Sequence, residues 1–262
     1  MKSWLLLAMP VLAYGAATDG PITAVAVKGT TTANGAQATQ GSTFKASATV
    51  LTAKDSDVVL WLGNGSKLTV TQDAEVILRT LKLSGEPVAP PPDGKSVREA
   101  NPSITEIEVV KGKVVGDVKK LAPESVYTLK TPVGTVRIKG TVFAVEFKRN
   151  ADGTAVFNVG CARGLVQVEM PGGAAPLAVK PGQQLSTTAA PGGAPAAPPK
   201  LMPLPPSPEV QAAVASNGAP PPGPPPGPPP GAPPPAAALD TMLQRVADSV
   251  INGQVNPSPT GG

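Results

Sequence analysis

The stretch that decides the fold is KTPVGTVRIKGTVFAVEF, residues 130–147. Apolar and polar residues alternate along two segments of this stretch, which are joined at residues 140–141. A period of two is typical of β-strands that bury one face, and the buried face of the second segment carries Phe143, Val145 and Phe147. A glycine between two such segments is typical of a bend or of a close approach between backbones. The stretch therefore predicts two strands that meet at a bend.

Further motifs surround this stretch in a recognisable order. A Thr-Pro pair precedes the first strand, a Gly-Thr-Val-Phe element opens the second, and a Gly-Leu-Val turn follows at residues 164–166. The earlier half carries VVLWLGNGSKLTV (residues 58–70) and Gly-Lys-Val (residues 112–114). Taken together, these elements resemble the signature of the FecR domain over about residues 25–186. The signature residues are Thr131, Pro132, Gly140, Thr141, Phe143 and Gly164.

The resemblance implies an all-β fold: a compact antiparallel sandwich or roll, or a short β-solenoid of the FecR type. FecR-type domains are known as the periplasmic part of transmembrane regulators that relay a signal from outer-membrane receptors to a cytoplasmic sigma factor. In that family the signature block marks the fold and is not an active site. We therefore expect the six signature residues to be structural.

The pattern of the whole region between residues 22 and 179 agrees with an all-β fold. Short alternating runs separated by turn signals are typical of a sandwich, barrel or roll. Residues 64–65 (Asn-Gly) and 152–153 (Asp-Gly) are strong hairpin turns, and residues 111–112 and 163–164 are weaker ones. We expect strands at residues 23–28, 44–51, 57–62, 67–71, 74–83, 105–110, 113–121, 125–131, 135–139, 142–148, 155–160, 165–169 and 175–179.

Two segments interrupt this regularity. Residues 30–40 are small and polar, which predicts a loop. Residues 84–101 contain a run of three prolines and several charges, which predicts an exposed insertion between two sheet segments.

The N-terminus has the layout of a secretory signal peptide. Lys2 precedes an apolar run from Trp4 to Leu12, and small residues follow up to Ala17. A short membrane anchor is the alternative, but the run is shorter than the roughly 20 apolar residues that span a bilayer. We expect residues 1–17 to be cleaved, leaving a chain without a transmembrane segment in the periplasm or outside the cell.

Composition excludes most kinds of catalysis. The chain has no histidine and one cysteine, so it lacks the Ser-His-Asp and Cys-His constellations and any thiolate zinc site. We expect no enzyme activity, no cofactor and no metal, and we expect Cys161 to be a small buried hydrophobe. The net charge of +4 is spread along the strands, which gives no sign of nucleic-acid binding.

Two residue classes bear on a carbohydrate-binding or hydrolytic alternative. Acidic residues near turns could in principle form a glycosidase pair, although acids at turns usually serve turn chemistry. Aromatic residues that could stack on sugars are scarce, and we expect them to be core. The acidic residues are Asp55, Asp57 and Asp73, and the aromatic residues are Trp61, Tyr127, Phe143, Phe147 and Phe157.

The C-terminal part has a different character. Of the 34 prolines, 20 lie between residues 191 and 235, a composition that favours a linker or disorder. Residues 207–209 (Ser-Pro-Glu) form a good helix start, with Val210 and Val214 on one face. We expect a second helix within residues 236–252. Four alternatives are open for it: docking on the β-domain, fraying in solution, pairing with another chain, or binding a partner. Its apolar stripe is Leu239, Met242, Leu243, Val246 and Val250.

The sequence thus predicts four parts: a signal peptide (1–17), a FecR-like β-domain (18–186), a Pro/Ala/Gly-rich linker (187–235) and a short amphipathic helix with a tail (236–262). The leading hypothesis is an exported, non-enzymatic binding module for protein–protein interaction or signal relay in the cell envelope. The alternative is an envelope or surface structural protein that self-associates through its C-terminal helix. A carbohydrate-binding β-domain is the third hypothesis.

Overall fold

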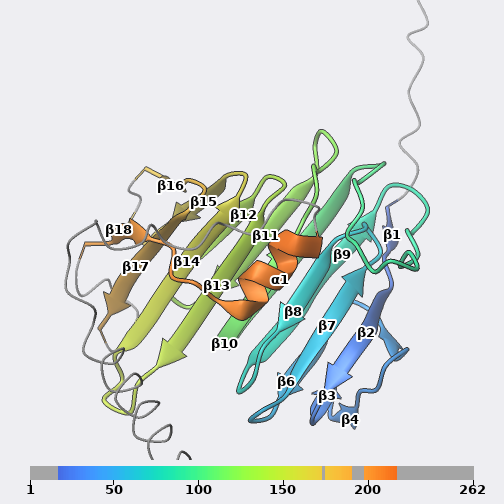
Figure 1. The fold of residues 1–262 in the computed structure, drawn as a ribbon, viewed down its shortest axis with the longest axis horizontal. Coiled ribbons are helices and arrows are strands. Elements are labelled where there is room, and N and C mark those ends of the chain that lie inside the picture. Colours follow the sequence, from blue (N-terminus) through green and yellow to red (C-terminus); the bar gives the residue numbers. More distant parts are fainter. Residues whose placement is uncertain (1–16, 173–174, 191–197, 217–262) are drawn as a thin grey trace, which may run out of the picture. The chain divides into compact units, whose positions relative to one another are not determined.

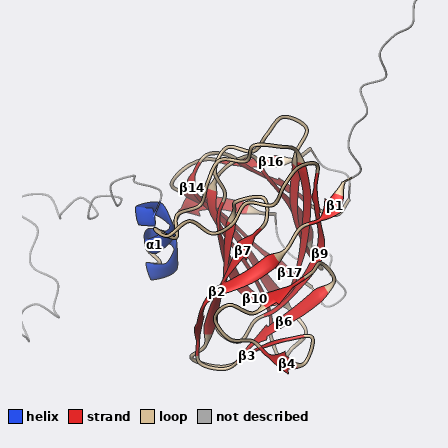
Figure 2. Ribbon diagram, turned by 90° about the vertical axis from the view of Figure 1, so that its right-hand side faces the viewer, coloured by secondary structure: helices blue, strands red, loops and turns tan. Residues whose placement is uncertain are grey.

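A computed structural model describes residues 17–172, 175–190 and 198–216 of the chain. The described part is almost entirely β, and its strands form two sheets that face each other (Figures 1 and 2). Every pairing between these strands is antiparallel except the parallel pairing of β10 with β11. The all-β prediction is therefore confirmed.

Sheet A contains the strands whose outer face is free of helix. In spatial order they are β4 (Ala36–Gln37), β3 (Thr31–Ala33), β6 (Ala48–Thr52), β9 (Glu75–Leu83), the first part of β10 (Ser103–Asp117), β11 (Val126–Thr131), β12 (Gly134–Ile138), β15 (Val166–Glu169) and β16 (Leu177–Val179), with β1 (Thr18–Asp19) on the end of β9.

Sheet B lies opposite. In spatial order it contains β5 (Thr43–Phe44), β2 (Ile22–Lys28), β7 (Asp57–Leu62), β8 (Lys67–Val70), the second part of β10, β13 (Val142–Arg149), β14 (Ala155–Arg163), β17 (Gln183–Ala189) and β18 (Lys200–Pro203). The helix α1 (Pro208–Ser216) lies on its outer face, in contact with β10, β13 and β14 (Figure 1).

Strand β10 belongs to both sheets. Its residues 103–111 pair with β9, and part of that stretch also pairs with β11, whereas residues 112–117 pair with β13 and residues 114–117 also pair with β8. The change occurs at Gly112, which has a positive φ of 91° and whose Cβ, if present, would lie 2.4 Å from that of Ala74. The predicted turn at residues 111–112 is therefore wrong: the glycine bends a continuous strand from one sheet into the other.

The bend predicted at residues 140–141 is confirmed, and it carries the chain between the sheets. Strand β12 before it lies in sheet A, and β13 after it lies in sheet B. Gly140 has a φ of 75°, and a Cβ there would lie 2.9 Å from the carbonyl oxygen of Lys119. A side chain is excluded by this close approach, so both conformation and space require glycine.

The core fills the space between the sheets. The inward face of β13 places Phe143, Val145 and Phe147 there, as predicted. Gly116 of β10 makes room for the Phe143 ring, because a Cβ at this glycine would lie 2.1 Å from the ring's Cζ. Tyr127 meets the same ring edge to face with centroids 6.2 Å apart.

The predicted loop at residues 30–40 is wrong in part. It contains the short hairpin β3–β4, whose turn residues Asn34 and Gly35 both have positive φ. Strand β17 was not predicted, because its sequence QQLSTTA is mostly polar and only alternate residues reach the core. It pairs with β14 along seven residues.

The insertion at residues 84–101 is anchored as well as exposed. Its buried Glu99 accepts hydrogen bonds from the hydroxyls of Ser103 and Ser125 and from the backbone N–H of Ala122 (2.8 Å). Val88 of the insertion accepts a 2.7 Å hydrogen bond from the indole N–H of Trp61, whose ring is thereby buried on the outer face of sheet B. The insertion therefore shields this side chain from solvent.

The predicted helix start at residues 207–209 is confirmed by α1, and Val210 and Val214 are its buried residues. Strand β18 and α1 both lie within the Pro/Ala/Gly-rich stretch expected to be a linker, and β17 continues to Ala189. The predicted signal peptide up to residue 16 and the stripe of Leu239, Met242, Leu243, Val246 and Val250 lie outside the described residues. Within the described part, no helix has the length and apolar character that crossing a membrane requires.

Candidate binding groove on the outer face of sheet B

A groove of about 880 Å³ lies on the outer face of sheet B. Outward residues of β7, β8, β10 and β13 form its floor, among them Val59, Thr69 and Val115, and α1 contributes Ala212 and Ala213. The alternation of the strands produces this floor, because every second residue faces the core and the others face outward. The groove is thus a property of the sheet face, with the helix beside it.

Helix α1 packs on the same face through a small apolar cluster. Val210 and Val214, four residues apart and hence on one side of the helix, contact a patch that includes Val115 of β10 and Val142 of β13. Leu204, in the segment between β18 and α1, packs against the edge of this cluster. The cluster is separate from the main core between the sheets.

A cation on the sheet holds the N-terminal end of α1. The ammonium of Lys113 donates to the hydroxyl of Ser207 (2.8 Å) and to the carboxylate of Glu209 (3.0 Å). Burial alone would raise the pKa of Glu209, but hydrogen bonds from Ser207, its own backbone N–H and Lys113 outweigh it and lower the pKa to about 2. The carboxylate is therefore charged at neutral pH and is paired with the sheet.

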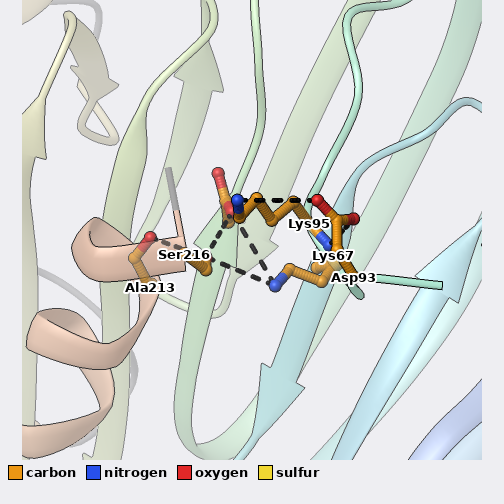
Figure 3. A network of polar contacts seen from close by, with 6 residues as sticks. Lys67, Asp93, Lys95, Ala213 and Ser216 are labelled. Atoms are coloured by element: carbon orange, nitrogen blue, oxygen red, sulfur yellow. Dashed lines mark hydrogen bonds and ion pairs between the residues drawn. The ribbon is translucent and has the colours of Figure 1, made fainter. Parts of the chain in front are cut away.

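A second polar cluster holds the C-terminal end of α1 (Figure 3). The Ser216 hydroxyl lies 3.0 Å from the carboxylate of Asp117 and 2.9 Å from the carbonyl of Ala213, so two acceptors share its proton. The ammonium of Lys67 lies 3.3 Å from the same hydroxyl and 4.0 Å from the carboxylate of Asp117. Because Asp117 is only 2% exposed, this carboxylate sits under the helix rather than in solvent.

The groove carries charges of both signs in equal number. This balance does not favour a polyanion such as nucleic acid, which needs a continuous basic surface. It suits a protein surface, whose charges are mixed. The cationic residues are Lys28, Lys67, Lys111, Lys113, Lys148 and Arg149, and the acidic ones are Asp55, Asp57, Asp73, Asp117, Glu146 and Glu209.

Two observations on the described residues concern metal ligands and the thiol. No group of three or more His, Cys, Asp or Glu side chains in the described part is placed to hold a metal ion. Cys161 lies in the core, away from the groove, and burial raises the pKa of its thiol to about 11. A thiol with this pKa is protonated at neutral pH and is a poor nucleophile.

The signature residues lie in turns, in corners and in the core, away from the groove. The hydroxyl of Thr131 donates to the carbonyl of Gly134 (3.0 Å) and accepts from the N–H of Val133 (3.3 Å), which closes the turn before β12 with Pro132 inside it. Gly140, Thr141 and Gly164 pack together at one corner, because a Cβ on Gly164 would lie 2.4 Å from the carbonyl oxygen of Gly140 and 3.0 Å from the Thr141 Cβ. Phe143 is core.

Sequence reasoning did not identify the groove. Its residues come from six elements (β2, β7, β8, β10, β13 and α1) and from the loops beside them, over residues 28–213, and they form no contiguous motif. The sequence does carry one signal for the groove, because alternate residues of a strand face outward. Examples are Lys67 and Thr69 on β8, and Lys113, Val115 and Asp117 on β10. Asp55, Asp57 and Asp73 do line the groove, beside cationic residues.

Comparisons with known proteins bear on the same residues. The family model described as FecR protein matches residues 48–167. The comparison with curated proteins gave no match. Two crystal structures of a "putative anti-sigma factor" from Parabacteroides distasonis ATCC 8503, at 1.65 and 2.50 Å resolution, are similar at 14% and 13% identity, with TM-scores of 0.41 and 0.42. Each match spans 59% of this chain and 59% of the other. Residues 48–167, which include β10 and the bend at Gly140, are a FecR domain.

Proposed function

We propose that this chain is an exported, non-enzymatic protein-binding module of the cell envelope, and that the groove on the outer face of sheet B receives its partner. The FecR domain supports an interaction role, and the signal-peptide layout of residues 1–17 supports export. The observation that carries the proposal is the groove itself: a concave, mixed-charge surface of about 880 Å³.

The charges of the groove include side chains that the fold does not use. Lys111 and Lys148 are exposed, and neither has an ion pair with another described residue. On the outer face of sheet A, in contrast, Arg79, Lys130 and Arg137 each contact a glutamate on a neighbouring strand at 2.6–2.7 Å. Charged side chains that have no ion pair within the fold can pair with those of another protein. This favours the groove over the outer face of sheet A as the binding surface.

Binding to the sheet face is also favoured over strand addition at the β18 edge. Strand β18 covers the edge of β17 and ends at Pro203, and Pro205 and Pro206 follow. Proline has no N–H to donate to an added strand, and prolines on an edge strand discourage further pairing. A carbohydrate-binding role has less support, because Trp61 is 2% exposed and cannot stack on a sugar.

The test is a crosslinked capture of partners from the cell envelope with the full chain. The groove variant Lys111→Glu/Lys148→Glu is compared with Lys139→Glu/Lys180→Glu, which makes the same change of net charge at exposed lysines outside the groove. We expect a defined envelope protein to be captured by the wild type and by the control, and its yield to fall by about tenfold or more with the groove variant. Equal capture by both variants, or recovery of the chain alone, would refute the proposal, and recovery of the chain alone would point to a self-associating structural protein.

A further inference from the structure

The helix α1 is attached to a β-domain whose core is complete without it. The main core lies between the sheets, whereas α1 packs on the outside through a cluster with only Val115 and Val142 as its fully buried sheet residues. The helix has nine residues, a length that is marginally stable in water without packing. Releasing α1 therefore leaves the sandwich intact and exposes a small apolar patch beside the groove.

The sheet recognises α1 by a specific chemical pattern. Two aliphatic side chains four residues apart meet the apolar patch, an acid in the first turn meets Lys113, and a hydroxyl at the last residue meets Asp117 and Lys67. On the sheet, these contacts are made by Lys113, Val115 and Asp117, which are alternate residues on the outer face of β10. Proteins that bind an amphipathic helix in a groove recognise it by side chains spaced in this way.

We propose that α1 is an intramolecular ligand that occupies part of the partner surface, and that a partner protein inserts an amphipathic helix of the same pattern after α1 leaves. This inference rests on the proposed function and adds its regulation. The partner helix carries two aliphatic residues at positions i and i+4 and an acid in its first turn, because those groups complement Val115, Val142 and Lys113. Binding of partner and docking of α1 exclude each other.

The competition sets the size of the expected effect. A ligand binds only those molecules whose binding surface is free, so its apparent affinity is the intrinsic affinity multiplied by the free fraction. If α1 is docked in about nine molecules of ten, its release strengthens binding of a competing helix by about tenfold.

The experiment uses full chains that differ only on α1. The variant Val210→Asp/Val214→Asp places charges in the buried cluster and releases the helix, while Gln211→Asp/Ala215→Asp makes the same change at the same spacing on the exposed side. The probe is a fluorescein-labelled peptide of residues 204–216, and its binding is measured by fluorescence anisotropy. A single cooperative urea transition with the same slope in all three chains establishes that the sandwich is retained, while the midpoint of the released chain is lower because docking of α1 stabilises the folded state.

We expect the peptide to bind the Val210→Asp/Val214→Asp chain at least about tenfold more tightly than the wild type or the control, and a peptide with the same two aspartates not to bind. Envelope capture of the partner should rise with the same variant. Equal peptide binding to all three chains would overturn the inference. So would a wild-type dimer in sedimentation that the variant lacks, because α1 would then dock on a second copy.

The two proposals fail in different ways. If Lys111→Glu/Lys148→Glu abolishes partner capture while Val210→Asp/Val214→Asp leaves capture and peptide binding unchanged, the groove binds a partner and α1 does not regulate it. If no chain captures a partner but the peptide discriminates between the variants, the helix surface exists and the proposed function is wrong.

Discussion

Gly140 is the residue on which the crossing between the two sheets depends. Replacing it by alanine adds the strain of a positive φ and a contact with the Lys119 carbonyl oxygen, so we expect the free energy of unfolding to fall by about 2–4 kcal/mol. Gly35 is a matched control, because its φ is 78° and no atom lies within 4 Å of the added Cβ. Gly35→Ala should cost about 1–2 kcal/mol, from the φ strain alone. Urea unfolding measures both, and equal losses would show that the close approach at Gly140 is unimportant.

Glu99 is the buried carboxylate that fastens the insertion to the β-domain. In Glu99→Ala the hydroxyls of Ser103 and Ser125 and the N–H of Ala122 lose their acceptor, and we expect about 2–4 kcal/mol of destabilisation in urea unfolding. Glu86→Ala removes an exposed acid from the same insertion and should change the stability by less than about 0.5 kcal/mol. A Glu99→Ala chain as stable as the wild type would mean that water replaces these bonds without cost.

Cys161 provides a probe of the core that needs no substitution. Because burial raises the pKa of its thiol to about 11, we expect alkylation by iodoacetamide at pH 8 to be slow in the folded chain. Urea should expose the thiol, return the pKa toward its ordinary value and accelerate the reaction at the unfolding midpoint. Mass spectrometry follows the modification, and rapid labelling of the folded chain would contradict the burial of this residue.

At the scale of single elements, sequence periodicity predicted the strands that bury one face and stand between clear turns. The strand at residues 57–62 has the predicted bounds, and α1 begins where its capping residues indicated. Periodicity could not show that Gly112 bends β10 between two sheets, because a glycine after a lysine has the same local pattern in a turn as in a bent strand. It also could not show where α1 docks, since the contacts of Lys113 with Glu209 join residues 96 positions apart.

The docking of α1 should depend on pH through Glu209. Its pKa in the folded chain, about 2, is lower than the ordinary value of 4.5, so the stabilisation is fully present above about pH 4.5 and is lost as the pH falls through 2. We expect protection of the α1 amides from hydrogen exchange to be constant from pH 7 to pH 5 and to decline below pH 4.5. Glu209→Gln should show lower protection and no such decline, and parallel profiles for the two chains would contradict the role of this carboxylate.

At the scale of the described domain, the two sheets differ in how their outer faces use charge. Sheet A pairs its charges across neighbouring strands, as in the contacts of Arg137 with Glu169 at 2.7 and 3.2 Å. Sheet B holds α1 through Lys113 and Asp117 and leaves the remaining face open as the groove. The sequence predicted an all-β domain with a resemblance to FecR. The groove could not be predicted, because it arises only when β7, β8, β10 and β13 are placed side by side.

The central claim is that a partner protein binds in this groove, and site-specific photocrosslinking in the cell tests it most directly. A photoreactive phenylalanine analogue is placed at Thr69 in the groove floor, and at Gln167 on the outer face of sheet A as the control. We predict that illumination attaches one defined envelope protein to the chain labelled at position 69 and none to the chain labelled at position 167. The same product from both positions, or a product from position 167 alone, would contradict the account.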